Sequence, residues 1–294
     1  MSTLKITNLS KTYPNGVKAL DNVNLELSNG MFGLLGPNGA GKSTLMRTLA
    51  TLQEADSGIA FLDNIDLFKQ PGELRKVLGY LPQEFGVYPR ISAEQLLNHI
   101  AVLKGITNKS ERKDMVSYLL NKVNLYDIRN KHVKGFSGGM KQRVGIAQAL
   151  IGNPKLIIVD EPTAGLDPGE RNRFHNLLAD VGEEVIVILS THIVDDVREL
   201  CTQMAIMNLG QIVFQDTPQN AIDAINGKVY QKIVKRTELE EYAKNYAIIS
   251  NKMVGGQPQI HIFSDTDPQD GFEQVNPDLE DVFFSKINTS NVLV

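Results

Sequence analysis

The stretch Gly36-Pro37-Asn38-Gly39-Ala40-Gly41-Lys42-Ser43-Thr44 decides the fold, because it has the pattern G-x-x-x-x-G-K-[ST]. Glycines in such a loop let backbone N–H groups turn inward and surround phosphate oxygens. The helix that follows points its positive N-terminal end at the same phosphates. The loop lies between a short apolar strand expected at Met31 to Leu35 and a helix expected at Lys42 to Leu52. We therefore predict an α/β fold with a phosphate-binding loop.

Every residue of this loop is a candidate for binding a nucleoside triphosphate: Gly36, Pro37, Asn38, Gly39, Ala40, Gly41, Lys42, Ser43 and Thr44. Lys42 would reach the β and γ phosphates, and Ser43 would place its hydroxyl on Mg²⁺. Such a loop occurs in kinases, GTPases, helicases and transport ATPases alike. The chain has no Asn-Lys-x-Asp segment of the kind that reads guanine, which argues against a GTPase.

A second pair of candidates ends the apolar strand expected at Leu156 to Val159, which runs directly into Asp160 and Glu161. A carboxylate at the end of a buried strand suits a Mg²⁺ ligand, and Asp160 fits that role. Glu161 points differently and would polarise the attacking water as a general base. The alternative is that both acids simply solvate the end of the strand. Because the chain also has a phosphate loop, the roles of Mg²⁺ ligand and general base are favoured.

Net charge, cysteine count and hydropathy limit the kinds of partner and location that we expect for this chain. A net charge of −4 gives no basic field that would attract nucleic acid, so we expect no nucleic-acid partner. Cys201 is the only cysteine, which excludes a disulfide within the chain. The first ten residues lack the features of a secretion signal, and no apolar window approaches the roughly 18 residues that span a bilayer. We expect a soluble chain that reaches a membrane only through a partner.

Most of the chain, up to about Pro218, mixes strands with helices. Short strands are expected at Leu4 to Ile6 and Asn24 to Leu27, on either side of a turn at Tyr13 to Gly16. The apolar runs Leu156 to Val159 and Val185 to Leu189 suit parallel strands buried on both faces. A hairpin is expected from Met204 to Met207 and from Gln211 to Phe214, around Leu209-Gly210.

Two further regions stand apart from this pattern. Residues Glu84 to Lys134 are expected to form a helical insertion, with a turn at Gly86 to Pro89 and a capping box from Ser92 to Gln95. Residues 219–294 carry 7 Lys/Arg against 11 Asp/Glu, which accounts for the whole net charge. There we predict a small α+β appendage with a hairpin around Gly255-Gly256 and a short helix at Asp278 to Ser285.

At this point a resemblance is close. Phe136-Ser137-Gly138-Gly139-Met140-Lys141-Gln142-Arg143 resembles the signature segment of the ATP-binding cassette (ABC) family. Tyr13, Gln83 and His192 follow in that family's order, as the residues that stack on adenine, contact Mg²⁺ and sense the γ-phosphate. Ala164-Gly165-Leu166-Asp167 resembles the loop that crosses the dimer interface. Without these neighbours, a lone Ser-Gly-Gly, Tyr or His is more often a linker, a packed aromatic or a cap.

The resemblance implies a P-loop NTPase core with an antiparallel β subdomain. It implies a nucleotide-binding domain over residues 1–218, with a helical subdomain over about 85–143 and an accessory domain over 219–294. ATP and Mg²⁺ are the implied cofactors. Asp160, Ser43 and Gln83 complete the metal shell, Glu161 is the base, and His192 and Lys42 hold phosphate. In the family the signature acts in trans, so Ser137, Gly138 and Gly139 would face the ATP held by Lys42 of a second subunit.

The signature departs from the common form, because Phe136 and Met140 stand where Leu and Gln are usual. This variant resembles exporter-type members whose membrane subunit is a separate chain, and so do Tyr80 to Pro89 and Leu279 to Phe283. The resemblance implies a transmembrane permease partner contacted near Glu84 to Pro89. It implies a second ATPase subunit, for which a copy of this chain suffices, and a cytoplasmic location on the inner face of the membrane. The transported substrate stays open.

The sequence disfavours three other functions. A DNA-repair ABC ATPase inserts a long coiled coil, but only the 94 residues 43–136 separate Lys42 from Ser137, with no sustained heptads. A ribosome-acting ABC protein usually carries two cassettes, whereas this chain has one. A module that senses ATP without hydrolysis is disfavoured because Glu161 and His192 are both present. For residues 219–294 the choices are bracing the dimer, binding a regulator, contacting the membrane subunit, or packing alone.

Overall fold

A six-stranded sheet forms the centre of the molecule in a computed structural model, which describes residues 1–83, 86, 90–163 and 165–287. Its strand order is β10-β9-β3-β8-β7-β6, and all neighbouring pairs are parallel except β9 and β10. The strands are β3 (Gly30–Leu35), β6 (Leu78–Leu81), β7 (Leu156–Asp160), β8 (Ile186–Thr191), β9 (Gln203–Asn208) and β10 (Gln211–Asp216). The predicted buried strands and the β9–β10 hairpin are therefore confirmed.

Alternate residues of the central strands supply two different hydrophobic cores. On β7, Ile157 and Val159 join one core, whereas Leu156 and Ile158 join the other. The strands are apolar along their length because successive side chains point to opposite faces and both faces are buried. The first core holds the helices α3 to α7, and the second lies between the sheet, α1 and the N-terminal strands.

The N-terminal strands form a separate antiparallel sheet of order β2-β1-β4-β5. Its strands are β1 (Thr3–Thr12), β2 (Lys18–Ser28), β4 (Ser57–Leu62) and β5 (Ile65–Asp66). The first two are longer than the predicted Leu4 to Ile6 and Asn24 to Leu27. Pairing continues past Leu9, opposite Val23, because both side chains are buried in the second core.

Helix α1 (Lys42–Leu49) begins within the last three residues of the glycine loop and ends earlier than predicted. Thr51 adopts a left-handed backbone conformation (φ 55°), and the Leu52 side chain is 61% exposed. Leu52 therefore does not extend the apolar face of the helix. The other helices that pack on the two sheets are α2 (Pro71–Val77), α6 (Pro168–Gly182) and α7 (Val194–Leu200).

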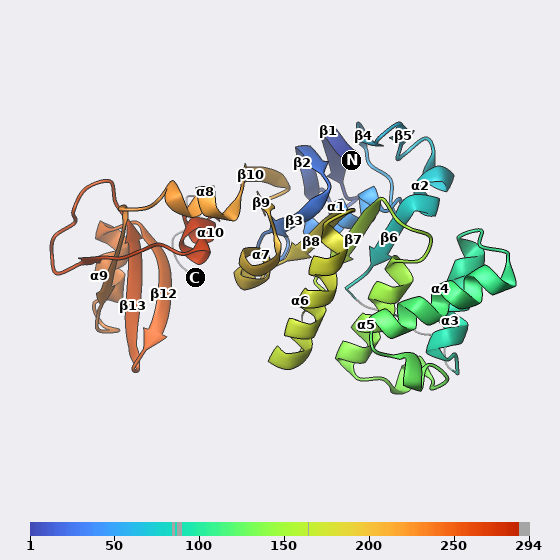
Figure 1. Ribbon diagram of the computed structural model, residues 1–294. Coiled ribbons are helices and arrows are strands. Elements are labelled where there is room, and N and C mark those ends of the chain that lie inside the picture. The colour runs from blue at the N-terminus through green and yellow to red at the C-terminus, as the bar shows by residue number, and fades with distance from the viewer. Residues whose placement is uncertain (84–85, 87–89, 164, 288–294) are drawn as a thin grey trace.

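A group of helices lies at one side of the central sheet, in green in Figure 1. It contains α3 (Ala93–Leu103), α4 (Lys109–Lys122), α5 (Gly138–Ala149) and the short turns Tyr126–Ile128 and Val133–Gly135. The capping box at α3 is confirmed, since Ser92 and Gln95 exchange both of its hydrogen bonds. Of the turn predicted at Gly86 to Pro89, all but Gly86 lies outside the described residues.

The C-terminal part is α+β, as predicted. It consists of α8 (Pro218–Asp223), β11 (Val229–Ile233), α9 (Leu239–Asn245), β12 (Ile248–Val254), β13 (Gln257–Phe263), β14 (Glu273–Gln274) and α10 (Leu279–Ile287). The strand order is β12-β13-β11-β14, and β12 and β13 form the predicted hairpin around Gly255-Gly256.

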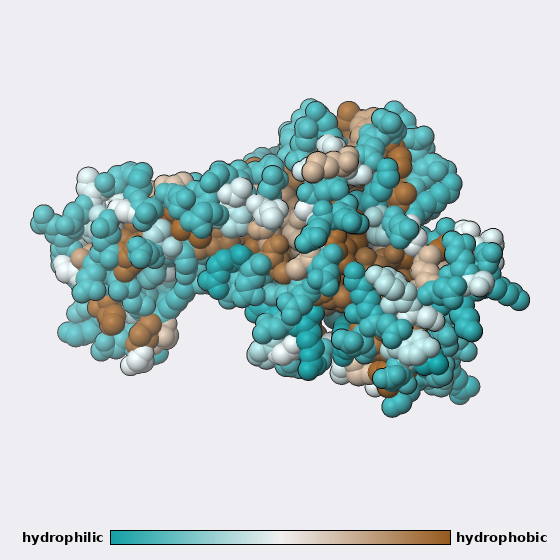
Figure 2. All heavy atoms as spheres, viewed as in Figure 1, coloured by the Kyte–Doolittle hydropathy of each residue, from teal (hydrophilic) through white to brown (hydrophobic). Residues whose placement is uncertain are grey.

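The last helix joins this part to the ATP-binding core predicted from the sequence. Leu279, Val282 and Phe283 of α10 belong to the same buried cluster as Val197 of α7. Hydrophobic residues are visible where the C-terminal lobe meets the central body in Figure 2. Residues of the C-terminal part therefore complete a core that also serves the central sheet. Among the described residues, no helix is both long and apolar enough to cross a membrane.

Candidate functional site

The glycine loop is held in its shape by close backbone contacts. It connects β3 to α1, as the pattern requires, and Gly41 caps the helix with φ 108°. A Cβ atom at Gly41 would lie 2.2 Å from the carbonyl oxygen of Ala19. Only glycine accommodates both this φ and this approach. The loop therefore ends at the N-terminus of α1, where the first N–H groups of a helix can bind phosphate.

Lys42 is turned into the site, and its side chain is only 4% exposed. Its Nζ donates hydrogen bonds to the carbonyl oxygens of Gly36 (2.7 Å) and Pro37 (3.2 Å) and lies 3.6 Å from Oε1 of Glu161. Burial lowers the pKa of Lys42, and the negative charge of Glu161 opposes this shift. The structure thus brings together a loop cation and a strand-end carboxylate that lie far apart in the sequence.

Asp160 ends β7 beside the first turn of α1. Its Oδ1 accepts hydrogen bonds from Oγ of Ser43 (3.3 Å) and from Oγ of Ser190 at the end of β8. This cluster of a carboxylate and hydroxyl oxygens at the loop fits Mg²⁺, which prefers oxygen ligands and is usually held by one or two carboxylates together with phosphate. Ser190 was not predicted as a site residue, although it directly follows the apolar run predicted at Val185 to Leu189.

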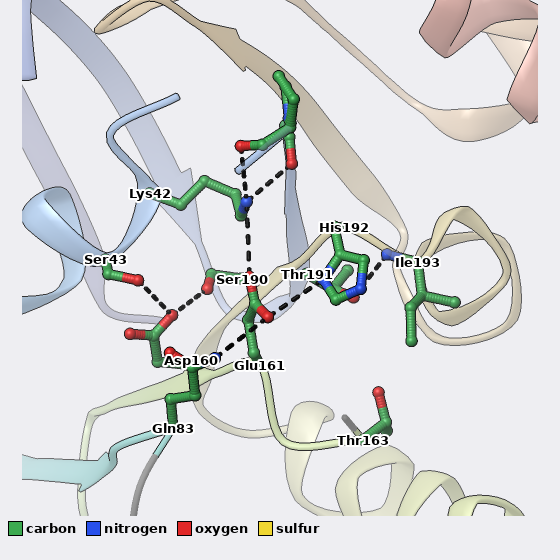
Figure 3. A network of polar contacts seen from close by, with 12 residues as sticks. Lys42, Ser43, Gln83, Asp160, Glu161, Thr163, Ser190, Thr191, His192 and Ile193 are labelled. Atoms are coloured by element: carbon green, nitrogen blue, oxygen red, sulfur yellow. Dashed lines mark hydrogen bonds and ion pairs between the residues drawn. The ribbon is translucent and has the colours of Figure 1, made fainter. Parts of the chain in front are cut away.

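Glu161 has an unusual backbone conformation, with φ 46°. Residues of this kind cost about 1–3 kcal/mol and persist where surrounding contacts hold them. The Glu161 N–H donates to the carbonyl oxygen of Ser190 (2.9 Å). The side chain meets Nδ1 of His192 at 3.1 Å and Nε2 of Gln83 at 3.5 Å, as Figure 3 shows. Gln83 therefore faces Glu161 in this structure, and no hydrogen bond among the described residues joins it to Asp160.

Tyr13 follows β1 and is only partly exposed. Its hydroxyl lies 3.2 Å from Oγ1 of Thr44, the last residue of the glycine loop, and donates to Oε1 of Gln53 at 3.2 Å. Gln53 also donates to the Thr44 carbonyl oxygen. The Tyr13 hydroxyl is thus linked to the end of the glycine loop, and the stacking of its ring on adenine stays a prediction. Sequence reasoning missed Gln53, which carries no signal of its own.

The signature segment forms a second helix N-terminus. Ser137 caps α5 by accepting a hydrogen bond from the Met140 N–H at 3.2 Å, and Phe136 is buried in the first core. Ser137 and Gly138 are exposed. Within the described part of the chain, no hydrogen bond or ion pair connects these residues to Lys42, Ser43 or Asp160. The described contacts therefore do not join the signature to the glycine loop of the same chain.

Gly139 packs tightly on helix α6. A Cβ atom there would lie 2.3 Å from Oε2 of Glu170, which is 3.5 Å from Nε of Arg143. The segment before α6 corresponds to the predicted interface loop. Its Asp167 caps α6 by accepting from the Glu170 N–H (2.9 Å), whereas Ala164 lies outside the described residues.

Comparison with known proteins identifies the family. Residues 20–164 match the sequence profile described as "ABC transporter". The ABC transporter ATP-binding protein NatA of Bacillus subtilis (strain 168) is 37% identical over 202 residues, which cover 68% of this chain and 82% of NatA. This chain belongs to the ATP-binding proteins of ABC transporters. The resemblance of its motifs to that family is confirmed.

Other ABC proteins match more of the chain. The methionine import ATP-binding protein MetN of Histophilus somni (strain 129Pt) is 32% identical over 296 residues, covering 92% of this chain and 85% of MetN. A solved dimer of the ATP-binding cassette MJ0796, bound to ADP and Pi, has 28% sequence identity and a TM-score of 0.67, covering 73% of this chain and 98% of that one. The P-loop NTPase fold is therefore confirmed, and the chain is an ABC ATPase that binds ATP and works as a transporter subunit.

Proposed function

We propose that this ABC ATPase powers an exporter, and that two copies of the chain close on two ATP molecules and reopen after hydrolysis. The observation that carries the proposal is the convergence of three side chains in Figure 3: Lys42 at the start of α1, Glu161 after β7 and His192 after β8. Parallel strands bring their carboxyl ends to one edge of a sheet, which is where open α/β folds place ligands. A complete hydrolytic set in one chain makes two copies sufficient.

Each side chain has a proposed role at this edge. The glycine loop and Lys42 bind the phosphates, and Tyr13 contacts adenine. Ser43, Asp160 and Gln83 hold Mg²⁺, which when bound neutralises charge on the phosphate oxygens. Glu161 accepts the proton of the attacking water. His192 contacts the γ-phosphate and meets the Glu161 carboxylate at 3.1 Å.

The proposed homodimer is supported by the exposure of Ser137 and Gly138, which no hydrogen bond or ion pair among the described residues joins to the glycine loop. The signature would complete the ATP site of the partner through the N–H groups at the start of α5. Because the site is then shared between chains, ATPase activity should rise more steeply than linearly with protein concentration. Strict proportionality in a sample that sedimentation shows to be monomeric would contradict the homodimer.

We propose that residues 1–218 form the nucleotide-binding domain, with its helical subdomain over about 85–143, and that residues 219–294 are accessory. A transmembrane permease would bind near Glu84 to Pro89 and hold the chain at the inner face of the cell membrane. The test is to purify the tagged chain from detergent-solubilised membranes. A multi-spanning protein should co-purify, and its repeated absence would contradict this partnership.

The direction of transport is proposed from the signature variant at Phe136 and Met140 and from the segments Tyr80 to Pro89 and Leu279 to Phe283. MetN, a relative named for import, makes direction the point to test. The purified complex can be placed in liposomes with ATP outside, which energises only outward-facing ATPases. An exporter then accumulates a labelled lipophilic dye or ion in the lumen. ATP-dependent loss of preloaded cargo would show import instead.

A further inference from the structure

Asp196 on α7 is a fully buried carboxylate, with 0% exposure. It contacts the two segments that carry Glu161 and His192. Its Oδ2 accepts hydrogen bonds from Oγ1 of Thr163 (2.6 Å) and Oγ1 of Thr191 (3.1 Å). Thr163 lies two residues after Glu161, and Thr191 directly precedes His192. We propose that Asp196 is a positioning residue, which uses one oxygen atom to hold together the two segments that carry Glu161 and His192.

The second oxygen of Asp196, Oδ1, is bound by two side chains of α6. Oδ1 accepts from Nε of Arg171 (2.8 Å) and lies 2.9 Å from Nε2 of His175. Both residues belong to α6, and Nδ1 of His175 is 2.9 Å from Oε2 of Glu199. These partners compensate a charge that would otherwise be costly to bury. They also fix the direction of the Asp196 carboxylate, because hydrogen bonds between charged groups are short and strong.

The backbone conformation at Glu161 and His192 explains why hydrogen bonds from Asp196 are needed there. Glu161 adopts φ 46°, which surrounding contacts must hold. It is anchored before by its N–H bond to Ser190 and after by the Thr163–Asp196 bond. On the other strand, Oγ1 of Thr191 accepts from the Ile193 N–H at 2.9 Å, so it fixes the backbone on both sides of His192. One carboxylate thus sets the relative position of base and histidine.

A specific kinetic effect follows from this geometry. No hydrogen bond or ion pair of Asp196 among the described residues reaches Lys42, Ser43 or the glycine loop. Loss of Asp196 should therefore displace Glu161 and His192, while Lys42 and the glycine loop keep their contacts with ATP. Misplacement of catalytic groups by about 1 Å lowers the rate by about a hundredfold. We expect kcat to fall tenfold or more while the KM for ATP changes by less than about threefold.

This inference rests on the proposed roles of Glu161 and His192, and the test separates the two. Steady-state kinetics would compare wild type with Asp196→Ala, Thr163→Val and the double variant. Because Thr163 acts through Asp196, adding Thr163→Val to Asp196→Ala should lower kcat by less than a further twofold. The matched control is Asp195→Ala, the neighbouring carboxylate, which is exposed and paired only with Arg198 among the described residues. Its kcat should stay within twofold of wild type.

Unchanged kcat in folded Asp196→Ala and Thr163→Val, or fully additive effects in the double variant, would overturn the inference. A parallel rise in KM would do the same, because it would indicate general damage to the site. If Asp196→Ala does not fold, Thr163→Val and Thr191→Val decide alone: a lower kcat at an unchanged melting temperature supports the tie. Glu161→Gln is the reference variant, because full turnover in it would contradict the role of Glu161 as general base, whatever Asp196 does.

Discussion

Nδ1 of His192 lies 3.1 Å from Oε2 of Glu161, although 31 positions separate the two residues in the chain. The contact joins the segments that follow two neighbouring parallel strands, β7 and β8. The same glutamate lies 3.6 Å from Nζ of Lys42. A single carboxylate therefore connects the glycine loop to the histidine segment.

Glu161→Gln should abolish most ATP turnover while leaving ATP binding intact. The amide cannot accept the proton of water, and general-base catalysis contributes about 10²–10⁴ in rate. The glycine loop and Lys42 stay in place to hold nucleotide. Phosphate release and binding of a fluorescent ATP analogue measure the two effects separately. Glu184→Gln, at an exposed position, is the control and should hydrolyse ATP at the wild-type rate.

Lys104 should make stability depend on pH in a predictable direction. Its Nζ donates to the Leu78 carbonyl oxygen, and burial lowers the pKa of Lys104 from 10.5 to about 8. Between these two values the unfolded chain binds more protons than the folded one, so the free energy of unfolding rises with pH. Below pH 8 both states are protonated, and the buried charge exerts its full cost.

Lys104→Met removes this titration. The stability of the wild type relative to the variant should therefore rise by about 1–2 kcal/mol between pH 7 and pH 9.5, measured by urea unfolding. Lys113→Met, at an exposed position on α4, is the control and should show no such change. An equal pH dependence in wild type and Lys104→Met would contradict the effect of burial.

Gly139→Ala should destabilise the chain through a clash with Glu170, independently of any ligand. The new Cβ would lie 2.3 Å from Oε2 of Glu170, whose other oxygen is held by Arg173 at 2.8 Å. Overpacking of this kind costs about 1–3 kcal/mol. Gly138→Ala is the control, because its nearest neighbour is Cδ2 of Leu166 at an ordinary 3.8 Å. Thermal unfolding without nucleotide compares the variants.

Shortening Glu170 should relieve the same clash. In a Glu170→Ala background, Gly139→Ala should cost clearly less stability than it does alone, because the methyl group then has room. Equal costs in the two backgrounds would place the strain elsewhere.

Phe283→Ala should destabilise the whole chain rather than the C-terminal part alone. Phe283 is 5% exposed within the core that also contains Val197 of α7, and removal of such a ring costs about 3–5 kcal/mol. It also lines a cavity of about 240 Å³ with His192. ATPase activity and far-UV circular dichroism should be lost at the same, lowered temperature. Activity that survives at the wild-type temperature would show that α10 is dispensable for the core. Val254→Ala, on the exposed end of β12, is the control.

Local sequence patterns predicted most elements because their causes are local. The two-faced burial of β7 and β8 is visible as unbroken apolar runs, and the Ser92 capping box as a spacing of three. The predicted end of α1 at Leu52 was wrong, because the Leu52 side chain is apolar but does not pack in the core. The burial of α10 against α7 was not foreseen, because an apolar helix face does not reveal what covers it.

The sequence by itself determined that this chain has a phosphate loop, two strand-end acids and a signature segment, because each needs particular residues at fixed spacing. Tertiary structure alone decided which side chains meet. Asp196 and Thr163 are ordinary residues in sequence, yet parallel strands β7 and β8 end side by side and α7 returns beneath them. Hydrogen bonds between segments about 30 residues apart depend on that packing, which no local pattern records.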